Sequence, residues 1–214
     1  MTISDVMNMD IPDRFGKDEM GDYTDEVWEV IDQLPEEQQN SVATGVSKFV
    51  FSLNEEEVVK IPFDGMWQEV DWDEFDGEDE EDFSFTLYDN NYCEIETSVY
   101  ADAVAAGVEM FFASTKYVGV SKNNKPIYVS EKVNNWYHGW KPTPSKGSVE
   151  KAEQTESELS TDWLAVAYEV YGDDLVNRLL DFIHDEGIDD LHRGNLGVRQ
   201  DGTPCILDYS SFDW

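Results

Sequence analysis

The amino-acid sequence predicts an α+β fold, and three observations support this. Segments with helical apolar periodicity alternate along the chain with segments of strand-like alternation. Hydrophobic residues make up 40% of the 214 residues and aromatic residues 13%, which is enough to bury a core and argues against disorder. The predicted order is helix, two strands, acidic insert, helix, two strands, linker, two helices, polar loop and hairpin.

Residues 1–40 predict an N-terminal arm followed by a short helix. Pro12, Gly16 and Gly21 interrupt any helix in residues 1–22, which indicates a loose arm. A helical apolar stripe then runs from Asp25 to Leu34 and ends before a proline.

Residues 41–63 change to a period of two and predict two strands joined by a turn. Phe49 and Phe51 alternate with Lys48, Val50 and Ser52, three glutamates follow, and the run Val-Val-Lys-Ile then ends at Ile61. Gly45 lies just before the first strand and is either a turn glycine or part of a loop that covers phosphate.

An acidic insert spans residues 64–85. Eleven of the nineteen residues from 64 to 82 are acidic and none is basic, which is typical of a solvated loop. Trp67, Trp72 and Phe75 are unusual for such a loop and favour a segment that docks onto a basic partner. The sequence leaves both interpretations open.

The second half of the chain predicts alternating helices and strands. Residues 91–112 are expected to be helical with a break at Gly107, and two strands follow at residues 117–121 and 127–132. Residues 134–158 predict a linker or surface loop, and residues 159–183 predict two helices. Residues 196–206 predict a terminal hairpin with its turn at residues 200–202.

A polar loop near the C-terminus carries the clearest chemical pattern. Asn195 follows Asp190 by five positions, and Asp208 follows Asn195 by thirteen. Such a set can orient a hydroxyl nucleophile and hold magnesium on a nucleotide triphosphate. Phosphoryl transfer needs these functions, because its catalysis consists mostly of positioning and charge neutralisation.

This order and these residues resemble the protein-kinase-like fold over residues 41–212. Residues 190–195 read Asp-Leu-His-Arg-Gly-Asn, which is similar to the catalytic loop of aminoglycoside and choline kinases and of small kinase-like proteins from phages and large DNA viruses. Residues 206–210 read Ile-Leu-Asp-Tyr-Ser and occupy the place of the metal-binding Asp-Phe-Gly segment. The resemblance implies a bilobal fold with a small antiparallel-sheet N-lobe over residues 41–133 and a minimal helical C-lobe over residues 159–214.

The resemblance also implies ATP and Mg²⁺ as cofactors and assigns roles in the C-lobe. Asp190 would orient the substrate hydroxyl or accept its proton, and Asn195 and Asp208 would hold magnesium. Glu131 and Val133 fall at the hinge, where adenine would bond to the backbone. His192 is expected to support the loop rather than to act as a base.

Three further residues receive roles upstream. Lys60 looks like the third-strand lysine that neutralises phosphate oxygens, and Glu94 looks like the helix glutamate that holds it, with Glu96 as a rival. Gly45 looks like part of a reduced nucleotide loop. These roles are implied by the resemblance.

The chain departs from the family pattern in three places. Asp189 stands where many protein kinases have arginine, so regulation by a phosphorylated activation loop is not expected. Tyr209 and Ser210 replace Phe-Gly. The sequence ends six residues after Asp208, which indicates a C-lobe truncated before the helices that dock a protein substrate.

The charge balance is the most unusual bulk property. There are 48 acidic and 14 basic residues, giving a net charge of −34. Such a surface repels nucleic acid and anionic membranes and suits a basic protein as partner or substrate. The two distant cysteines, with no signal peptide or membrane span expected, indicate a cytoplasmic protein, in a host cytoplasm if a phage encodes it.

Two functions follow from these patterns. The first is an ATP- and magnesium-dependent phosphotransferase, of the serine/threonine kinase type, that acts on a host protein. The second is a strongly acidic kinase-like binding protein with little or no catalysis, such as a DNA mimic or an inhibitor of a basic host or defence protein. The sequence does not decide between them.

Overall fold

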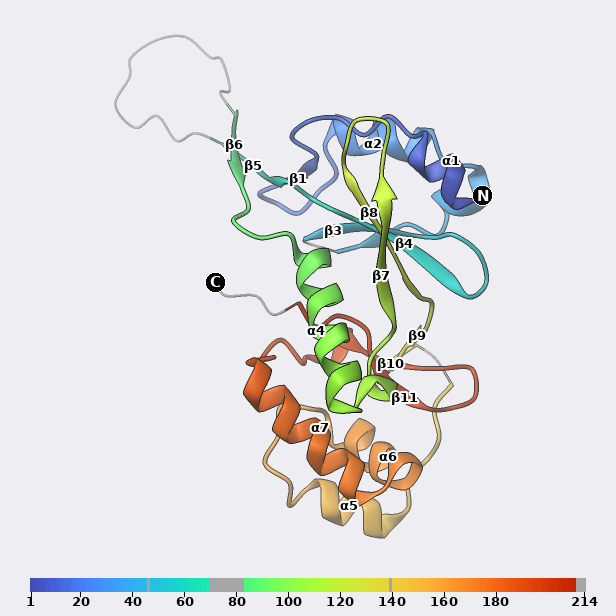
Figure 1. Cartoon of the computed structure of the whole chain (residues 1–214), viewed down its shortest axis with the longest axis vertical. Helices are drawn as coiled ribbons and strands as arrows, with labels where there is room; N and C mark the ends of the chain where they lie inside the picture. Colours follow the sequence, from blue (N-terminus) through green and yellow to red (C-terminus); the bar gives the residue numbers. More distant parts are fainter. Residues whose placement is uncertain (46, 70–82, 139, 211–214) are drawn as a thin grey trace, which may run out of the picture. The chain divides into compact units, whose positions relative to one another are not determined.

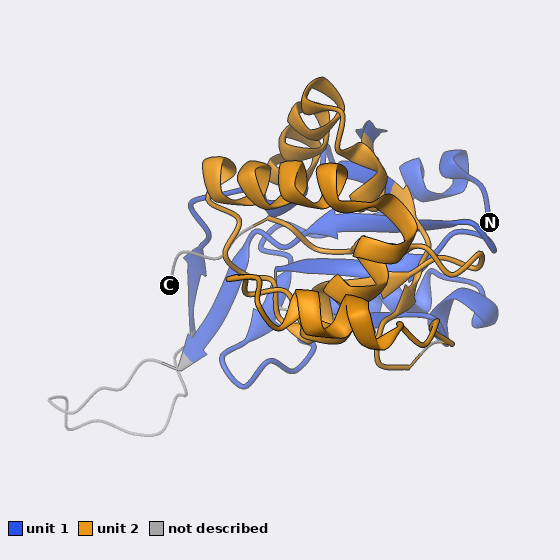
Figure 2. Cartoon of the chain, turned by 90° about the horizontal axis from the view of Figure 1, so that it is seen from below, with its two compact units in different colours: residues 1–93, 117–129 blue, residues 94–116, 130–214 orange. Residues whose placement is uncertain are grey.

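The computed structural model describes residues 1–45, 47–69, 83–138 and 140–210 (Figure 1). Helices and strands alternate along this part of the chain and several of its strand pairs are antiparallel, which confirms the α+β class. The chain forms two compact units (Figure 2). Unit 1 comprises residues 1–93 and 117–129, and unit 2 comprises residues 94–116 and 130–214.

Unit 1 is built on a five-stranded sheet of order β2-β3-β4-β8-β7. Its strands are β2 (Ala43–Thr44), β3 (Lys48–Ser52), β4 (Glu57–Pro62), β7 (Thr115–Val120) and β8 (Pro126–Glu131). The β2–β3 and β3–β4 pairs are antiparallel, so the predicted strand–turn–strand unit over residues 41–63 is confirmed. The strands predicted at residues 117–121 and 127–132 are also confirmed, as β7 and β8.

The β3–β4 hairpin separates apolar from charged side chains. Phe49 lies opposite Ile61, and both belong to the buried core of unit 1. Lys60 lies opposite Val50, two positions from Lys48 on β3. Because successive side chains on a strand alternate between faces, both lysines share the face opposite the core. Both lysine side chains are nevertheless buried.

The N-terminal residues are part of the core of unit 1, and the prediction of a loose arm is wrong. They form α1 (Ile3–Met7) and β1 (Gly16–Asp18). Val6, Ile11 and Phe15 are fully buried, and the Phe15 ring lies 5.7 Å from the ring of Phe49. The prolines and glycines that interrupt helical periodicity do not prevent single residues from being buried in a core made by distant strands.

Two short helices follow in unit 1, α2 (Asp25–Asp32) and α3 (Glu36–Gln39). The helix predicted from Asp25 to Leu34 is therefore confirmed. Val27, Val30 and Ile31 are buried in the same core as β3 and β4.

The ends of the acidic insert form strands. β5 (Gly65–Glu69) pairs antiparallel with β6 (Phe83–Leu87) and parallel with β1, giving a sheet of order β1-β5-β6. A Cβ atom on Gly16 would lie 2.1 Å from the Gly65 carbonyl oxygen, so the close approach of β1 requires glycine. Trp67 packs against Phe85, with 5.0 Å between the ring centroids. Residues 70–82, with Trp72 and Phe75, lie outside the described residues, so both interpretations of the acidic run stay predictions.

Unit 2 combines helices with a small sheet of order β11-β10-β9. Helix α4 (Tyr92–Ala106) ends at Gly107, which has a φ of 67°, and the predicted break is confirmed. The predicted linker over residues 134–158 instead contains a strand and a helix, β9 and α5. The other elements of unit 2 are η1 (Glu109–Phe111), β9 (Asn134–Asn135), α5 (Lys146–Ala152), α6 (Thr161–Tyr171), α7 (Asp173–Glu186), η2 (Arg193–Asn195), β10 (Leu196–Val198) and β11 (Pro204–Ile206).

Trp163 ties the helices of unit 2 to its hairpin. The side chain is fully buried on α6, and its Nε1 atom donates to the carbonyl oxygens of Gly197 and Cys205, each at 3.3 Å. These carbonyls belong to the paired strands β10 and β11. The predicted terminal hairpin is thus confirmed, and a buried aromatic residue of α6 fixes its position within the unit.

Candidate active site

The polar loop begins where α7 ends. Gly187 closes the helix in the left-handed conformation, with φ 66° and ψ 34°. Ile188 and Leu191 then bury their side chains in the core of unit 2. Asp190 lies between these two anchors and keeps about a third of its side chain, 32%, exposed to solvent. The backbone on both sides of Asp190 is therefore held by apolar burial.

Asn195 orients the Asp190 carboxylate. Its Nδ2 atom donates to the Asp190 carbonyl oxygen at 2.8 Å and to the Asp190 Oδ2 atom at 3.0 Å. The amide oxygen of Asn195 takes no part in these two bonds and is the atom that could bind a cation. Asp190 and Asn195 are five residues apart, and the Asn195 side-chain amide closes the short loop between them through these two bonds.

His192 supports the same loop. Its Nδ1 atom accepts a hydrogen bond from the Gly194 backbone N–H at 2.8 Å and caps η2. A Cβ atom on Gly194 would lie 2.5 Å from the imidazole, so the bond depends on glycine at this position. His192 Nε2 lies 3.6 Å from Asp190 Oδ1. The imidazole is engaged in the loop's own backbone, in agreement with the expected supporting role.

The hairpin brings Asp208 to the same end of the sheet as Asn195. Leu196 on β10 pairs with Ile206 on β11, and the next pair outward is joined by a bond from Leu207 N–H to Asn195 O at 2.7 Å. Asp208 is the following residue. Its Oδ1 atom accepts from the Ser210 hydroxyl at 2.9 Å. Asn195 and Asp208 therefore both follow the paired strands at the same end of the β10–β11 hairpin.

Tyr209 anchors the segment that carries Asp208. The ring is buried, and its hydroxyl donates to the Ala113 carbonyl oxygen at 2.7 Å. Burial raises the pKa of Tyr209 well above its usual value, and the nearby charges of Glu96 and Asp208 raise it further.

Helix α4 distinguishes the two glutamates that the sequence offered. The Glu94 side chain is exposed to solvent, whereas Glu96 is fully buried. A buried carboxylate needs compensating partners, so its burial has a structural reason or a functional one. Of the two residues, Glu96 is the one whose charge raises the pKa of Tyr209.

The upstream candidates lie in unit 1. Lys60 is 6% exposed on β4, and the backbone N–H of half-buried Gly45 donates to the Ala43 carbonyl oxygen. Val46, inside the predicted nucleotide loop, lies outside the described residues. Lys48 is 3% exposed on the same sheet face as Lys60 and received no role from the sequence. The alternation of side chains along the two predicted strands could have identified Lys48, because it puts Lys48 and Lys60 on one face of the sheet.

The two hinge candidates differ in their surroundings. The Glu131 carboxylate forms a two-bond ion pair with Arg199, at 2.7 Å from Nε and 3.0 Å from Nη2. The Glu131 backbone N–H donates to the Ser114 carbonyl oxygen. Glu131 therefore holds this segment in place through its side chain, and Val133, two residues on, is half-buried.

Arg199 was not found by the sequence reasoning. Besides Glu131, its guanidinium donates to the carbonyl oxygens of Met110 and Phe112, at 2.8 and 2.9 Å. Although burial opposes the charge, the hydrogen bonds to Glu131 raise the pKa of Arg199 overall. Arg199 directly follows a short apolar strand in the sequence, and this position does not indicate that its side chain makes several hydrogen bonds.

The described residues contain no group of three or more His, Cys, Asp or Glu side chains arranged to hold a metal ion. Magnesium is usually held by one or two protein ligands together with substrate phosphates. Asn195 and Asp208 fit that requirement, because an amide oxygen and a carboxylate lie at one end of the hairpin.

Neither a model of a known protein family nor a curated protein sequence matches this chain. In the part of the chain that is described, no helix is both long enough and apolar enough to cross a membrane. The arrangement of Asp190, Asn195 and Asp208 is therefore the main basis for assigning a function.

Proposed function

We propose that this chain is a small kinase-like phosphotransferase with a bilobal fold that uses ATP and Mg²⁺ to phosphorylate a protein hydroxyl. One observation carries the proposal. Asn195 is hydrogen-bonded to Asp190, and Asp208 follows Leu207, whose backbone N–H donates to the Asn195 carbonyl oxygen at the same end of the β10–β11 hairpin. The arrangement supplies a candidate base and two oxygen ligands at one site, which phosphoryl transfer requires.

Each residue then has a defined task. Asp190, oriented by Asn195, accepts the proton of the substrate hydroxyl while the hydroxyl oxygen bonds to the γ-phosphorus. The bond from that phosphorus to the bridging oxygen breaks, and ADP leaves. Asp208 and the Asn195 amide oxygen would hold Mg²⁺, which would supply neutralisation of the phosphate charge. Tyr209 and Leu207 hold Asp208 in position.

The sheet of unit 1 supports the proposal independently. In chain order β4 is the third strand of the five-stranded sheet, and it carries the buried Lys60, as in protein kinases. Helix α4 follows and buries Glu96. Within unit 2, the proposal gives the buried Glu96, rather than the exposed Glu94, a positioning role near Tyr209. Lys48 would add a second positive charge on the same face of the sheet.

The direct test is transfer of label from γ-labelled ATP to protein in the presence of Mg²⁺. Asp190→Asn and Asp208→Asn should each lower the rate by about 100-fold or more, because each removes a participating group. Asp181→Asn, on the exposed surface of α7, is the matched control and should retain the wild-type rate. Absence of nucleotide binding, or equal labelling by the Asp190 variant, would overturn the proposal.

The choice between the two glutamates has its own test. Glu96→Gln should reduce phosphate transfer at least tenfold, since it removes the charge of a buried carboxylate near Tyr209, the residue that anchors the Asp208 segment. Glu94→Gln should leave the rate within about twofold, as expected for an exposed substitution. The opposite ranking would restore Glu94 to the role that the sequence suggested.

A second function is favoured by the net charge of −34. A kinase-like chain of this charge could bind a basic DNA-binding protein in place of nucleic acid, with little or no catalysis. Its signature is salt-sensitive binding to such a protein, combined with no ATP turnover and no effect of Asp190→Asn on that binding. Loss of that binding in the Asp190 variant would count against a purely electrostatic mimic.

A further inference from the structure

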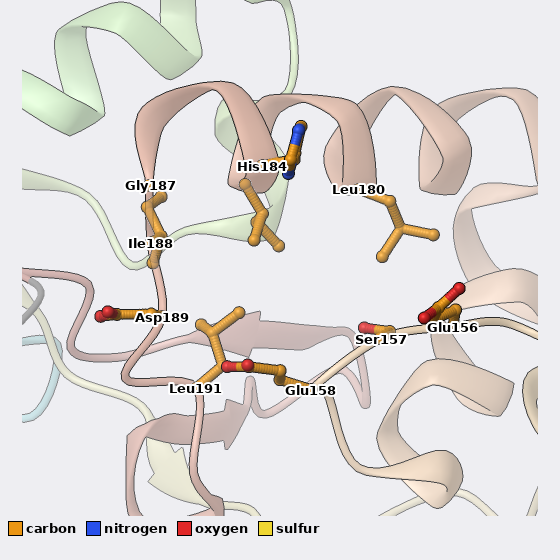
Figure 3. A pocket seen from close by; sticks show the side chains of 10 residues that line it. Glu156, Ser157, Glu158, Leu180, His184, Gly187, Ile188, Asp189 and Leu191 are labelled. Carbon is orange, nitrogen blue, oxygen red and sulfur yellow. The ribbon is translucent and has the colours of Figure 1, made fainter.

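A pocket of about 340 Å³ lies beside the polar loop in unit 2 (Figure 3). Helix α7 forms one side of the pocket, the loop after it forms the second, and residues 156–158 form the third. Its apolar lining comes from Leu180, Ile183, Ile188 and Leu191. Leu191 is the residue directly after Asp190, so the pocket begins one residue from the proposed base.

The rim of the pocket is acidic. Glu156, Glu158 and Asp189 are exposed at its edge, and its lining contains no lysine or arginine. Among the described residues, none of these three carboxylates takes part in a hydrogen bond or an ion pair. They differ in this respect from Asp162, which accepts bonds from Lys141 and from the Trp136 indole.

A second pocket, of about 470 Å³, adjoins the first. Both are lined by Glu158 and Leu191, and the second continues along the loop to His192 and Arg193. Together the two pockets form the docking groove, which runs between residues 156–162 and residues 187–193. The carboxylates of Glu156 and Asp189 line the pocket at the α7 end of the groove. Arg193 lines the pocket at the other end.

We propose that the docking groove binds a basic segment of the protein that is phosphorylated, with one apolar side chain in the pocket and a lysine or arginine against the acidic rim. Charge complementarity selects this occupant, because the rim offers unpaired carboxylates above an apolar floor. The assignment of this segment as substrate rests on the proposed function. An extended chain advances about 3.3 Å per residue, so a hydroxyl a few residues from the anchor would reach Asp190.

The test is binding of a labelled peptide of about ten residues that combines leucine and arginine, followed by fluorescence anisotropy without ATP. Glu156→Lys together with Glu158→Lys should weaken binding at least tenfold. The control, Glu55→Lys together with Glu56→Lys in the exposed β3–β4 turn, makes the same change in net charge and should stay within twofold. The milder pair Glu156→Gln and Glu158→Gln should give an intermediate loss and guards against misfolding.

Three results would overturn the groove. The first is equal weakening by the rim and control variants, which would show attraction to the whole acidic surface. The second is undiminished binding of a peptide with serine in place of leucine. The third is spermidine that binds as tightly as the peptide with the same dependence on Glu156 and Glu158, which would indicate a small polyamine ligand.

Catalysis separates the docking groove from the proposed function. In the labelling assay the rim variant should raise KM for the peptide and leave kcat and the KM for ATP unchanged. Peptide binding that depends on the rim without any phosphate transfer would refute the phosphotransferase and leave the docking groove standing. Phosphate transfer with the same KM for the peptide in the rim variant and the wild type would refute the docking groove but not the phosphotransferase.

Discussion

At the residue scale, Arg199 is expected to contribute more to stability than any exposed charge of unit 2. Its guanidinium joins Glu131 to two backbone carbonyls of the segment around η1. Arg199→Leu removes the cation and leaves Glu131 unpaired in a site where only 29% of that side chain is exposed. The free energy of unfolding should fall by about 2–3 kcal/mol, below the value for a fully buried pair because solvent reaches this one.

Urea unfolding followed by circular dichroism measures this loss. Arg199→Lys should cost less, because the ammonium keeps the charge but cannot make the forked contacts. Lys146→Ala removes an exposed ion pair with Glu150 and should change stability by less than about 0.5 kcal/mol. An equal loss in the free energy of unfolding for Arg199→Leu and Lys146→Ala would show that the Arg199 hydrogen bonds contribute no more to stability than an exposed ion pair.

A pH dependence follows from Cys205. Burial raises the pKa of this thiol from 9.0 to about 12. A raised pKa means that the folded state favours the protonated thiol, so its stabilisation is complete below pH 9 and is lost as pH rises from 9 towards 12. The contribution should decline by about 1.4 kcal/mol per pH unit in that window.

Cys205→Ala should therefore lose stability less steeply than the wild type between about pH 9 and 10, whatever its constant offset from the lost sulfur atom. Denaturant titrations at several pH values give the two slopes. Tyr171, whose pKa burial raises to about 12, adds its own decline only above pH 10 and so stays outside this window. Parallel slopes would show that the thiol does not titrate with unfolding.

The residue scale also shows how far the sequence could predict the candidate site. The spacing of Asp190, Asn195 and Asp208 is local, and a loop followed by one hairpin is enough to bring such residues together. The choice between Glu94 and Glu96 depends on which face of α4 is buried, and the mixed apolar pattern of that helix did not reveal it. Arg199 could not be identified because Glu131 and the carbonyl of Met110, two of its partners, lie 68 and 89 positions away in the chain.

At the element scale, two glycines are expected to respond in opposite ways to alanine. Gly187 ends α7 with a positive φ of 66°, which an alanine adopts only with strain. Gly147 lies inside helix α5, where an added methyl group would meet no atom within 4 Å, and helical glycine is less favourable than alanine. Gly187→Ala should destabilise by about 1 kcal/mol, and Gly147→Ala should stabilise by about 0.5–1 kcal/mol.

Thermal unfolding of the two variants beside the wild type checks this pair. A higher midpoint for Gly147→Ala and a lower one for Gly187→Ala is the expected result. Two shifts of the same sign would show that position in the helix, rather than backbone conformation, decides the outcome.

The elements that the sequence predicted correctly are those with sustained periodicity. The β3–β4 hairpin and α4 belong to this group. The elements that it missed are short and punctuated by proline or glycine, such as β1 and α5. Strand β1 exists because it pairs with β5, 49 positions away in the first register pair, Gly16 with Gly65. The local sequence pattern does not indicate pairing with a strand so far along the chain, so the N-terminal residues were predicted to form a loose arm.

At the scale of the whole molecule, the net charge of −34 should make stability rise with salt. With 48 acidic and 14 basic residues, repulsive pairs outnumber attractive ones, and a compact state brings them together. The Debye length falls from about 30 Å at 0.01 M salt to about 10 Å at 0.1 M, so added salt screens this repulsion. Screening also weakens exposed ion pairs such as Lys122–Asp10, but these contribute little.

The thermal midpoint should therefore rise by a few degrees between about 10 and 300 mM NaCl, since each kcal/mol shifts the midpoint of a chain of this size by about 2–4 °C. Tetramethylammonium chloride at equal ionic strength should give the same rise if screening is the cause. A falling midpoint would show that attractive pairs dominate. Binding of a basic peptide to the docking groove should weaken over the same range, because the same ions screen the acidic rim. The two effects have opposite signs, so loss of binding in salt cannot be attributed to unfolding.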